Sequence, residues 1–463
     1  KLFYIDERGE GRDKVYSTVF LKDTILNKLQ SNPVAQQMLQ FGNNIGNLFP
    51  NEEALCMASA FMQDKQTRIV VKKNRYEAQQ LYQRLKPLIN DTLLFVMEES
   101  LRVQAIASSP EDKQEQLYVL TQLVKEDKPR IIICNTAAFL RYLPDKELFK
   151  SLCYKFEVDQ EITMAELKQK LNRAGYTKVN YVDRPCTYAS RGGIVDVYCL
   201  EYEHPIRIAF FDTVIESIRL FHEETQRTIQ TIDSVLINPA TDLLFTDDQI
   251  EYLQKEIDSE LEKQQAKLIQ DDYDFLLDYI EKDKISIENY NIDPHLYIYF
   301  SYLNANKLTD YVNGHIIFSS QEEVESGYKK LNEETISFIQ EMVESHQYLP
   351  KYGMFHDIFT FEKEHTIQMF HDFLDFKHPI FSNIETLEQS DQPLIQILEN
   401  LKGENIYISL DEEHTKKVQE ALKAYSIHRN ITFIKDDFYE GFTYEDISVY
   451  THLELFHHPS QIK

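Results

Sequence analysis

The sequence predicts an α/β protein: a parallel sheet interrupted by a small antiparallel β module with one helix, then a second small α/β unit. Strand-like and helix-like segments alternate over residues 20–150, strands dominate from 153 to 237, and the alternation returns after an acidic helical stretch. Strand–helix alternation is typical of parallel sheets, whereas consecutive strands indicate antiparallel ones. A chain of 463 residues is also too long for a single core, so several domains are expected.

The first α/β region contains three short apolar runs that fit buried strands. These runs are RIVVK (68–72), TLLFV (92–96) and RIIIC (130–134). The segments between them carry apolar side chains at helical spacing. The second of these helices has a readable start, because Ser109 can cap it and Pro110 suits the first helical position. Cys134, within its apolar run, is expected to be a buried small hydrophobe.

The strand-rich block from 153 to 237 opens with one helix, TMAELKQKLNRAGY. Thr163 and Glu166 form a capping box at its start, and Gly175 suits a left-handed residue at its end. The runs IRIAFF and VIESIRLF then flank Asp212, which indicates a hairpin. We therefore expect a small antiparallel sheet with one helix against it, inserted into the first α/β domain.

The remaining chain is acidic and helical from 244 to 290, and then returns to α/β alternation. LYIYFS (296–301) and HIIFSS (315–320) are predicted strands, and Ser320 is predicted to cap a long helix. The predicted division is a first part of the α/β domain (1–152), the inserted domain (153–237), a second part of the α/β domain (238–355), a connecting segment (356–382) and a small α/β domain of unknown role (383–463).

Charge and composition exclude some functions. Lys and Arg total 49 against 76 Asp and Glu, a formal net charge of −27. This excess argues against free-standing nucleic-acid binding, which needs a basic surface, and favours protein partners. No apolar run reaches the roughly 18 residues of a membrane span, and the start of the sequence lacks a signal-peptide pattern. The five cysteines form no C-x-x-C pair, so we expect a cytoplasmic protein without membrane contact.

The α/β region invites a search for a phosphate-binding loop. The place to look is FGNNIGNLFPNEEALCMASAF (41–61), where Gly42 and Gly46 precede a helix. A phosphate loop needs a lysine, but the chain has no Gly-Lys dipeptide, and Glu52 and Glu53 stand where positive charge is needed. We therefore expect a nucleotide-type scaffold that has lost its site, with no catalytic residue and no bound cofactor.

The histidines predict no metal site. His365 and His371 are six positions apart, which does not match an i, i+4 helical pair, and no H-E-x-x-H motif occurs. His457 and His458 lie near the end of the sequence. Glu412, Glu413 and His414 fit an acid-biased helix start better than general acid–base chemistry.

Arg191 is the one side chain that stands out. It precedes Gly192 and Gly193, which permit a close approach of backbone or partner. The block 153–237 carries 10 basic and 13 acidic side chains, so it is far less acidic than the rest of the chain. Two interpretations stay open: Arg191 pairs with Asp196 or Asp212 inside the module, or it binds a partner.

A resemblance adds to this pattern. Residues 175–229 resemble the bacterial transcription-repair coupling factors (Mfd) and, more loosely, the excision-repair protein UvrB. The motifs that carry the likeness are Arg-Gly-Gly-Ile-x-Asp, Pro-x-Arg-Ile-x-x-Phe, Glu-Ser-Ile-Arg-x-Phe and Thr-Gln-Arg. The likeness extends to 99–117 and to 441–456, whereas residues 1–20 match nothing in the family pattern.

The resemblance implies a UvrB-like domain that looks like a degenerate helicase lobe, split by an inserted domain. In the family an RNA-polymerase-binding domain and an ATP-driven DNA translocase follow, so ATP, Mg²⁺, RNA polymerase and DNA are expected to bind parts absent from this chain. The DNA-probing aromatic hairpin of UvrB has no counterpart in the sequence. The family also implies that the motor domains cover the inserted domain until a rearrangement exposes it.

The inserted domain is the part through which the family is understood to bind UvrA. The family's contact positions fall on Lys178 and Arg191, a further UvrB arginine falls on Ala189 and is missing, and Ile194 or Val195 would add an apolar contact. The expected function is thus a non-catalytic module that recruits UvrA to stalled RNA polymerase in transcription-coupled nucleotide excision repair. The alternatives are a nucleotide-dependent helicase-like DNA-binding domain and a structural or autoinhibitory clamp.

Overall fold

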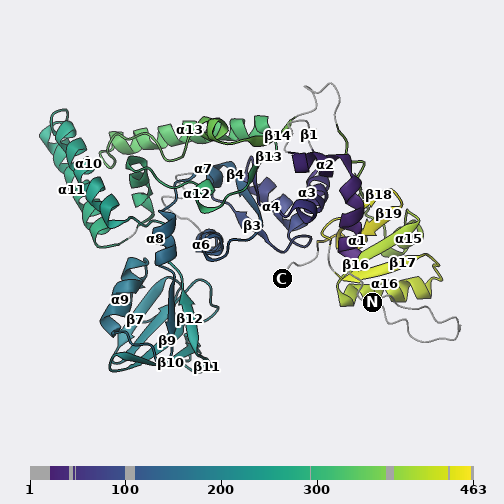
Figure 1. Cartoon of the computed structure of the whole chain (residues 1–463), viewed down its shortest axis with the longest axis horizontal. Helices are drawn as coiled ribbons and strands as arrows, with labels where there is room; N and C mark the ends of the chain where they lie inside the picture. Colours follow the sequence, from purple (N-terminus) through teal and green to yellow (C-terminus); the bar gives the residue numbers. More distant parts are fainter. Residues whose placement is uncertain are drawn as a thin grey trace.

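A six-stranded, wholly parallel sheet forms the centre of the α/β region in the computed structural model (Figure 1). Its strands, in spatial order, are β1 (Ile45–Gly46), β14 (Ile367–His371), β13 (His315–Phe318), β2 (Arg68–Lys72), β4 (Ile131–Asn135) and β3 (Thr92–Phe95). The predicted α/β class is confirmed. Strands from before and after the strand-rich block share this sheet, as a divided domain requires.

The structure describes most of the chain. The described ranges are 21–40, 45–46, 48–99, 110–291, 293–371, 380–435 and 438–459. The predictions made for Gly42, Ser109 and residues 1–20 lie outside them.

Helices cover both faces of the parallel sheet because its strands are apolar on both sides. Val70 and Ile133 face a core shared with the first four helices, whereas Ile69, Val71 and Cys134 face the opposite core, and Cys134 is buried as predicted. The helices are α1 (Leu21–Lys28), the short 3₁₀ turn Leu29–Ser31, α2 (Pro33–Gln40), α3 (Pro50–Asp64) and α4 (Arg75–Leu85) on the first side, with α6 (Pro110–Lys125), α7 (Thr136–Leu140) and α8 (Lys146–Ser151) on the other side.

The strand-rich block forms a second six-stranded sheet below the first in Figure 1. Its strands are, in spatial order, β11 (Thr228–Ile232), β10 (Val214–Phe221), β9 (Ile206–Phe211), β8 (Ile194–Tyr198), β7 (Thr187–Arg191) and β6 (Thr177–Lys178). The helix α9 (Met164–Arg173) packs against one face of this sheet. The strands β5 (Tyr154–Glu157) and β12 (Ser234–Ile237) form a separate antiparallel pair. The capping box of α9 is confirmed, and so is the hairpin around Asp212. One prediction needs correction: β6 pairs with β7 in parallel, so the sheet is mixed.

The acidic stretch folds into a helical hairpin, α10 (Asp247–Gln265) and α11 (Gln270–Glu288), beside the 24-residue α13 (Gln321–Glu344). Ser320 accepts a hydrogen bond from the Glu323 amide at 3.4 Å, as its predicted capping role requires. The strand predicted for LYIYFS is wrong: Pro294–Tyr302 forms a 3₁₀ helix. An uninterrupted apolar run does not distinguish a buried strand from a buried helical turn. The short helix α12 (Leu308–Tyr311) follows.

The segment 356–382, predicted to connect two domains, instead contributes to the first one. It contains α14 (Ile358–Glu364) and the strand β14, which lies between β1 and β13 in the parallel sheet. IQMF alternates polar and apolar side chains only weakly, so its pairing was not visible from local sequence. The other proposed domain boundaries stay predictions.

The C-terminal unit has a mixed five-stranded sheet. Its order is β15 (Glu385–Thr386), β18 (Phe442–Tyr444), β19 (Ile447–Tyr450), β16 (Asn405–Leu410) and β17 (Ile431–Lys435), with helices α15 (Leu394–Glu399), α16 (Glu412–Ala424) and α17 (His452–Phe456). Phe442 and Val449 share a core with α1–α4, and Arg84 pairs with Glu440 at 2.6 Å. The unit therefore packs directly on the α/β domain. Among the described residues, no helix has the length and apolarity needed to cross a membrane.

Candidate partner-binding surface

The Arg-Gly-Gly sequence forms the tight turn between β7 and β8. Gly192 has a φ of 56°, which suits the two-residue hairpin turns that follow the strand twist. At Gly193 an added Cβ would lie 3.1 Å from the carbonyl oxygen of Phe210, so the neighbouring strand leaves little room for a side chain. The two glycines thus shape the turn and bring Arg191 to its start.

Strand register separates the candidate residues between the two faces of this sheet. Arg191 is paired with Ile194, which is half-buried, so both side chains lie on the face away from α9. Val195 points to the opposite face and is 0% exposed in the core. Val195 is therefore excluded as a surface contact, and Ile194 remains.

Lys178 and Arg191 are not brought together. Lys178 is aligned in parallel with Tyr188, and Tyr188 donates a hydrogen bond to Asn172 of α9 at 2.9 Å. Since paired residues share a face, Lys178 lies on the α9 side. The structure therefore places the two predicted contact residues on opposite faces, although both are exposed.

Arg191 takes neither of the internal pairings that the sequence left open. Asp196 is held by Arg207, whose Nε and Nη2 donate to its two carboxylate oxygens at 2.8 Å each. In the described part of the chain no carboxylate lies within ion-pair distance of Arg191; its guanidinium stands 4.9 Å from the centroid of the Tyr181 ring. A cation–π contact at an exposed site orients the arginine and leaves its hydrogen-bond donors available.

The face that carries Arg191 also exposes aromatic side chains. We call it the outer face; it comprises Tyr181, Arg191, Ile194, Arg207, Phe211 and Arg219. Tyr181 is 64% exposed and Phe211 is 74% exposed. Exposed aromatic residues beside arginine are the composition of protein-interface hot spots. Sequence reasoning missed Tyr181 and Phe211, because the strand pattern alone does not show which aromatic residues lack cover.

The bidentate pair between Asp196 and Arg207 is expected to stabilise the inserted sheet. Arg207→Ala leaves Asp196, which is nearly buried, without its charge partner, and should lower local stability by about 2–3 kcal/mol. Native-state amide hydrogen exchange in β8 and β9 measures this loss. Arg219→Ala, an exposed neighbour on β10 without a described ion pair, should change it by less than ~0.5 kcal/mol. Equal effects of the two substitutions would contradict the assignment.

The expected nucleotide position, at the start of α3, is occupied by carboxylates. Glu52 accepts a hydrogen bond from the Phe49 amide at 2.9 Å, which caps the helix that a phosphate would otherwise approach. Glu53 is 1% exposed and pairs with Lys72 at 2.6 Å. Ser319 donates a hydrogen bond to Glu53 at 2.9 Å as well. The carboxylate of Glu53 therefore compensates the charge of Lys72, so this lysine is not available as a phosphate ligand.

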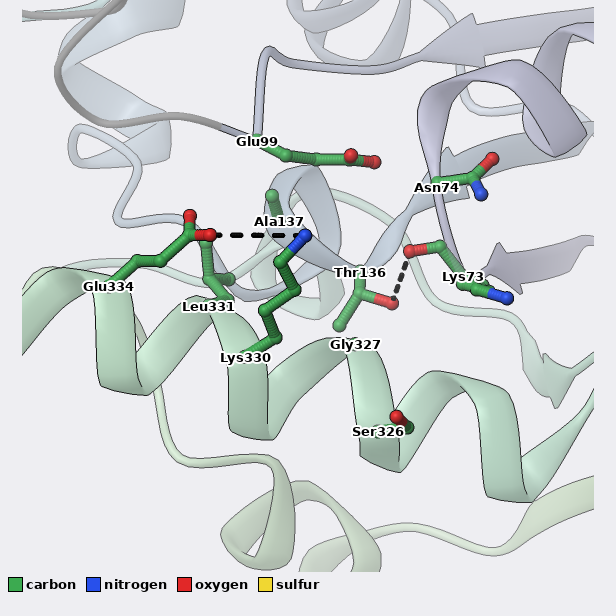
Figure 2. A pocket seen from close by; sticks show the side chains of 10 residues that line it. All are labelled: Lys73, Asn74, Glu99, Thr136, Ala137, Ser326, Gly327, Lys330, Leu331 and Glu334. Atoms are coloured by element: carbon green, nitrogen blue, oxygen red, sulfur yellow. Dashed lines mark hydrogen bonds and ion pairs between the residues drawn. The ribbon is translucent and has the colours of Figure 1, made fainter.

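A cavity lies between the carboxyl ends of β2 and β4 and the helix α13. Open α/β sheets commonly bind ligands at the carboxyl ends of their strands. Figure 2 shows its lysines, and Lys330 points toward Glu334 at 3.9 Å. Lys73 pairs with Glu323 at 3.1 Å. The cavity measures about 180 Å³, below the roughly 300–1,000 Å³ of typical small-molecule sites. Its paired charges and small size do not favour a nucleotide.

Comparisons with known proteins agree with the likeness seen in the sequence. Residues 154–243 match the UvrB interaction domain family. The chain is 28% identical over 402 residues to the transcription-repair-coupling factor of Bacillus subtilis, covering 81% of this chain and 34% of that protein. It is 28% identical over 305 residues to the same factor from Staphylococcus haemolyticus, covering 64% of this chain and 26% of that protein.

The resemblance to the N-terminal region of transcription-repair-coupling factors is thus confirmed. The chain spans about a quarter to a third of the length of these curated relatives. Because the UvrB interaction domain match covers the outer face, the likeness and the exposed arginine–aromatic group fall on the same part of the molecule.

Proposed function

We propose that this chain acts in transcription-coupled nucleotide excision repair by recruiting UvrA through the outer face of its inserted domain. The observation that carries the proposal is Arg191: it is exposed, lies over Tyr181, and has no acid partner among the described residues. An arginine held in place with its donors free suits a carboxylate on a partner surface. The names of the matched family and relatives point to the same process.

The positions of the candidate residues in the sheet support a narrower version of this proposal. Arg191 and Ile194 lie together on the outer face, with Tyr181 and Phe211 as further contacts. Lys178, on the α9 side, takes part only if UvrA wraps round the edge strand β6. We therefore place the centre of the interface at the β7–β8 hairpin.

We also propose that the chain itself is non-catalytic and binds no nucleotide cofactor. The capping carboxylate Glu52 and the buried pair between Glu53 and Lys72 support this, because both oppose phosphate binding. In this proposal ATP, Mg²⁺, RNA polymerase and DNA bind the portion of the relatives outside the matched region. Contact of the inserted domain with motor domains of the same protein, and a cytoplasmic location, are parts of the same proposal.

Titration calorimetry of UvrA into this chain tests the proposal. We expect saturable one-to-one binding per inserted domain, and no thermal shift on addition of an ATP analogue with Mg²⁺. Absence of UvrA binding by the folded chain would contradict recruitment and favour the structural or autoinhibitory clamp. ATP binding together with salt-sensitive DNA binding would instead support the helicase-like alternative.

A further inference from the structure

Two histidines and an aspartate meet at one edge of the C-terminal sheet. The neighbouring strands β16 and β19 are parallel, so their carboxyl ends lie at the same edge. Asp411 follows β16 directly and caps α16, and His414 lies three residues further on. His452 follows β19 and begins α17. The fold therefore brings together ligand-type side chains separated by about forty positions in the sequence.

One carboxylate oxygen stands between the two imidazoles. The Oδ2 atom of Asp411 lies 2.8 Å from Nδ1 of His414 and 3.1 Å from Nε2 of His452. The ring centroids of the two histidines are 4.8 Å apart, and one potential ligand atom from each of the three residues lies within 4.8 Å of the others. His452 is only 2% exposed, so its ring is fixed by packing.

We propose that Asp411, His414 and His452 bind a divalent transition-metal ion, with Zn²⁺ as the best match. Imidazole nitrogen and carboxylate oxygen are ordinary zinc ligands, at about 2.0–2.2 Å from the ion. Ligand atoms on a tetrahedral ion then stand roughly 3.3 Å apart, close to the 2.8 and 3.1 Å separations seen here. Small movements of His414 would admit the ion.

The set has the chemistry of a three-ligand site with one position left for another donor. His458 is a candidate for that position, since its ring centroid lies 5.7 Å from that of His414 and 6.0 Å from that of His452. A bound ion would join the start of α16 to α17 and to the residues after it. This inference is independent of UvrA recruitment, because the inserted domain contributes no ligand.

The sequence did not reveal this set. In the sequence, His414 fits an acid-biased helix start, and His452 lies 41 positions beyond Asp411, so no local spacing links the two. Only the pairing of β16 with β19 brings His452 to Asp411. The prediction of no metal site therefore gives way to this proposal.

Calorimetric titration of the chelator-treated chain with ZnCl₂ tests the site, with Co²⁺ absorption spectra as a report on ligand geometry. We expect one ion per chain and tetrahedral-type Co²⁺ bands. His414→Ala should weaken Zn²⁺ binding at least about 100-fold, since even outer-shell changes cost 10–100-fold. Asp411→Asn should also weaken it strongly, while asparagine still caps α16 and preserves the fold. The matched control is His428→Ala, an exposed histidine of the same unit.

Two results would overturn the proposal. The first is an absence of Zn²⁺ binding by the wild-type chain below millimolar concentration, which would mean that the three side chains form a hydrogen-bonded cluster and no metal site. Binding that persists unchanged in both His414→Ala and Asp411→Asn would place the ion elsewhere. Circular dichroism of each variant confirms that the fold is retained, so that a loss of binding reports on the ligands.

Discussion

Replacement of Arg191 by alanine is expected to weaken UvrA binding by about 2 kcal/mol or more, roughly 30-fold, while the fold stays intact. The guanidinium has no described ion-pair partner to lose within the chain, so the substitution removes donors aimed at a partner rather than an internal contact. Removal of the cation–π contact with Tyr181 should cost only ~0.5–1 kcal/mol of local stability. Calorimetric titration of UvrA into the wild-type chain and the variant measures the difference.

Arg227→Ala is the matched control for this substitution. Arg227 is exposed in the same domain, just before β11 at the other edge of the sheet. It should change UvrA affinity less than threefold. Equal losses in the two variants would indicate a general charge effect, and unchanged affinity in a folded Arg191→Ala chain would remove Arg191 from the interface.

Replacement of Glu53 by alanine is expected to destabilise the α/β domain by about 3–5 kcal/mol. Among the described residues, the substitution leaves the ammonium of Lys72 buried with Ser319 as its one remaining side-chain partner. The cost arises from this uncompensated charge, because the pair itself stabilises little relative to apolar side chains. Native-state hydrogen exchange of the amides of β2 measures the change in the free energy of opening.

Glu323→Ala provides the comparison. Glu323 forms an exposed ion pair with Lys73, the residue that directly follows Lys72. Exposed pairs contribute about 0–1 kcal/mol. Adding Lys72→Met to Glu53→Ala should restore most of the lost stability. If Glu53→Ala costs no more than Glu323→Ala, Glu53 does not neutralise a buried lysine and the lost-site explanation fails.

Local sequence patterns predicted much of the fold. The bounds of β9 and β10 match the apolar runs from which they were predicted, and the start of α9 matches its capping box. These elements have alternating patterns or turn and cap residues that act over a few positions. The 3₁₀ helix over Pro294–Tyr302 contains an unbroken run of apolar and aromatic side chains from Leu296 to Phe300, so no period distinguished it from a strand.

Long-range pairing explains the other differences. β14 is defined by its neighbours β1 and β13, which lie far away in the sequence, and local composition carries no information on such a partner. For the same reason the sequence predicted only part of the outer face. Arg191 and the alternation of Ile194 with Val195 followed from the sequence, whereas the exposure of Tyr181 and Phe211 depends on which faces of the sheet α9 leaves open.

Amide hydrogen exchange of this chain with and without saturating UvrA tests the central claim most directly. We predict added protection in residues 179–195, which include Tyr181, the Arg-Gly-Gly turn and the start of β8, with little change in α9 or in the C-terminal unit. Protection confined to α9, to the parallel sheet or to the C-terminal unit, with residues 179–195 unchanged, would contradict an interface on the outer face.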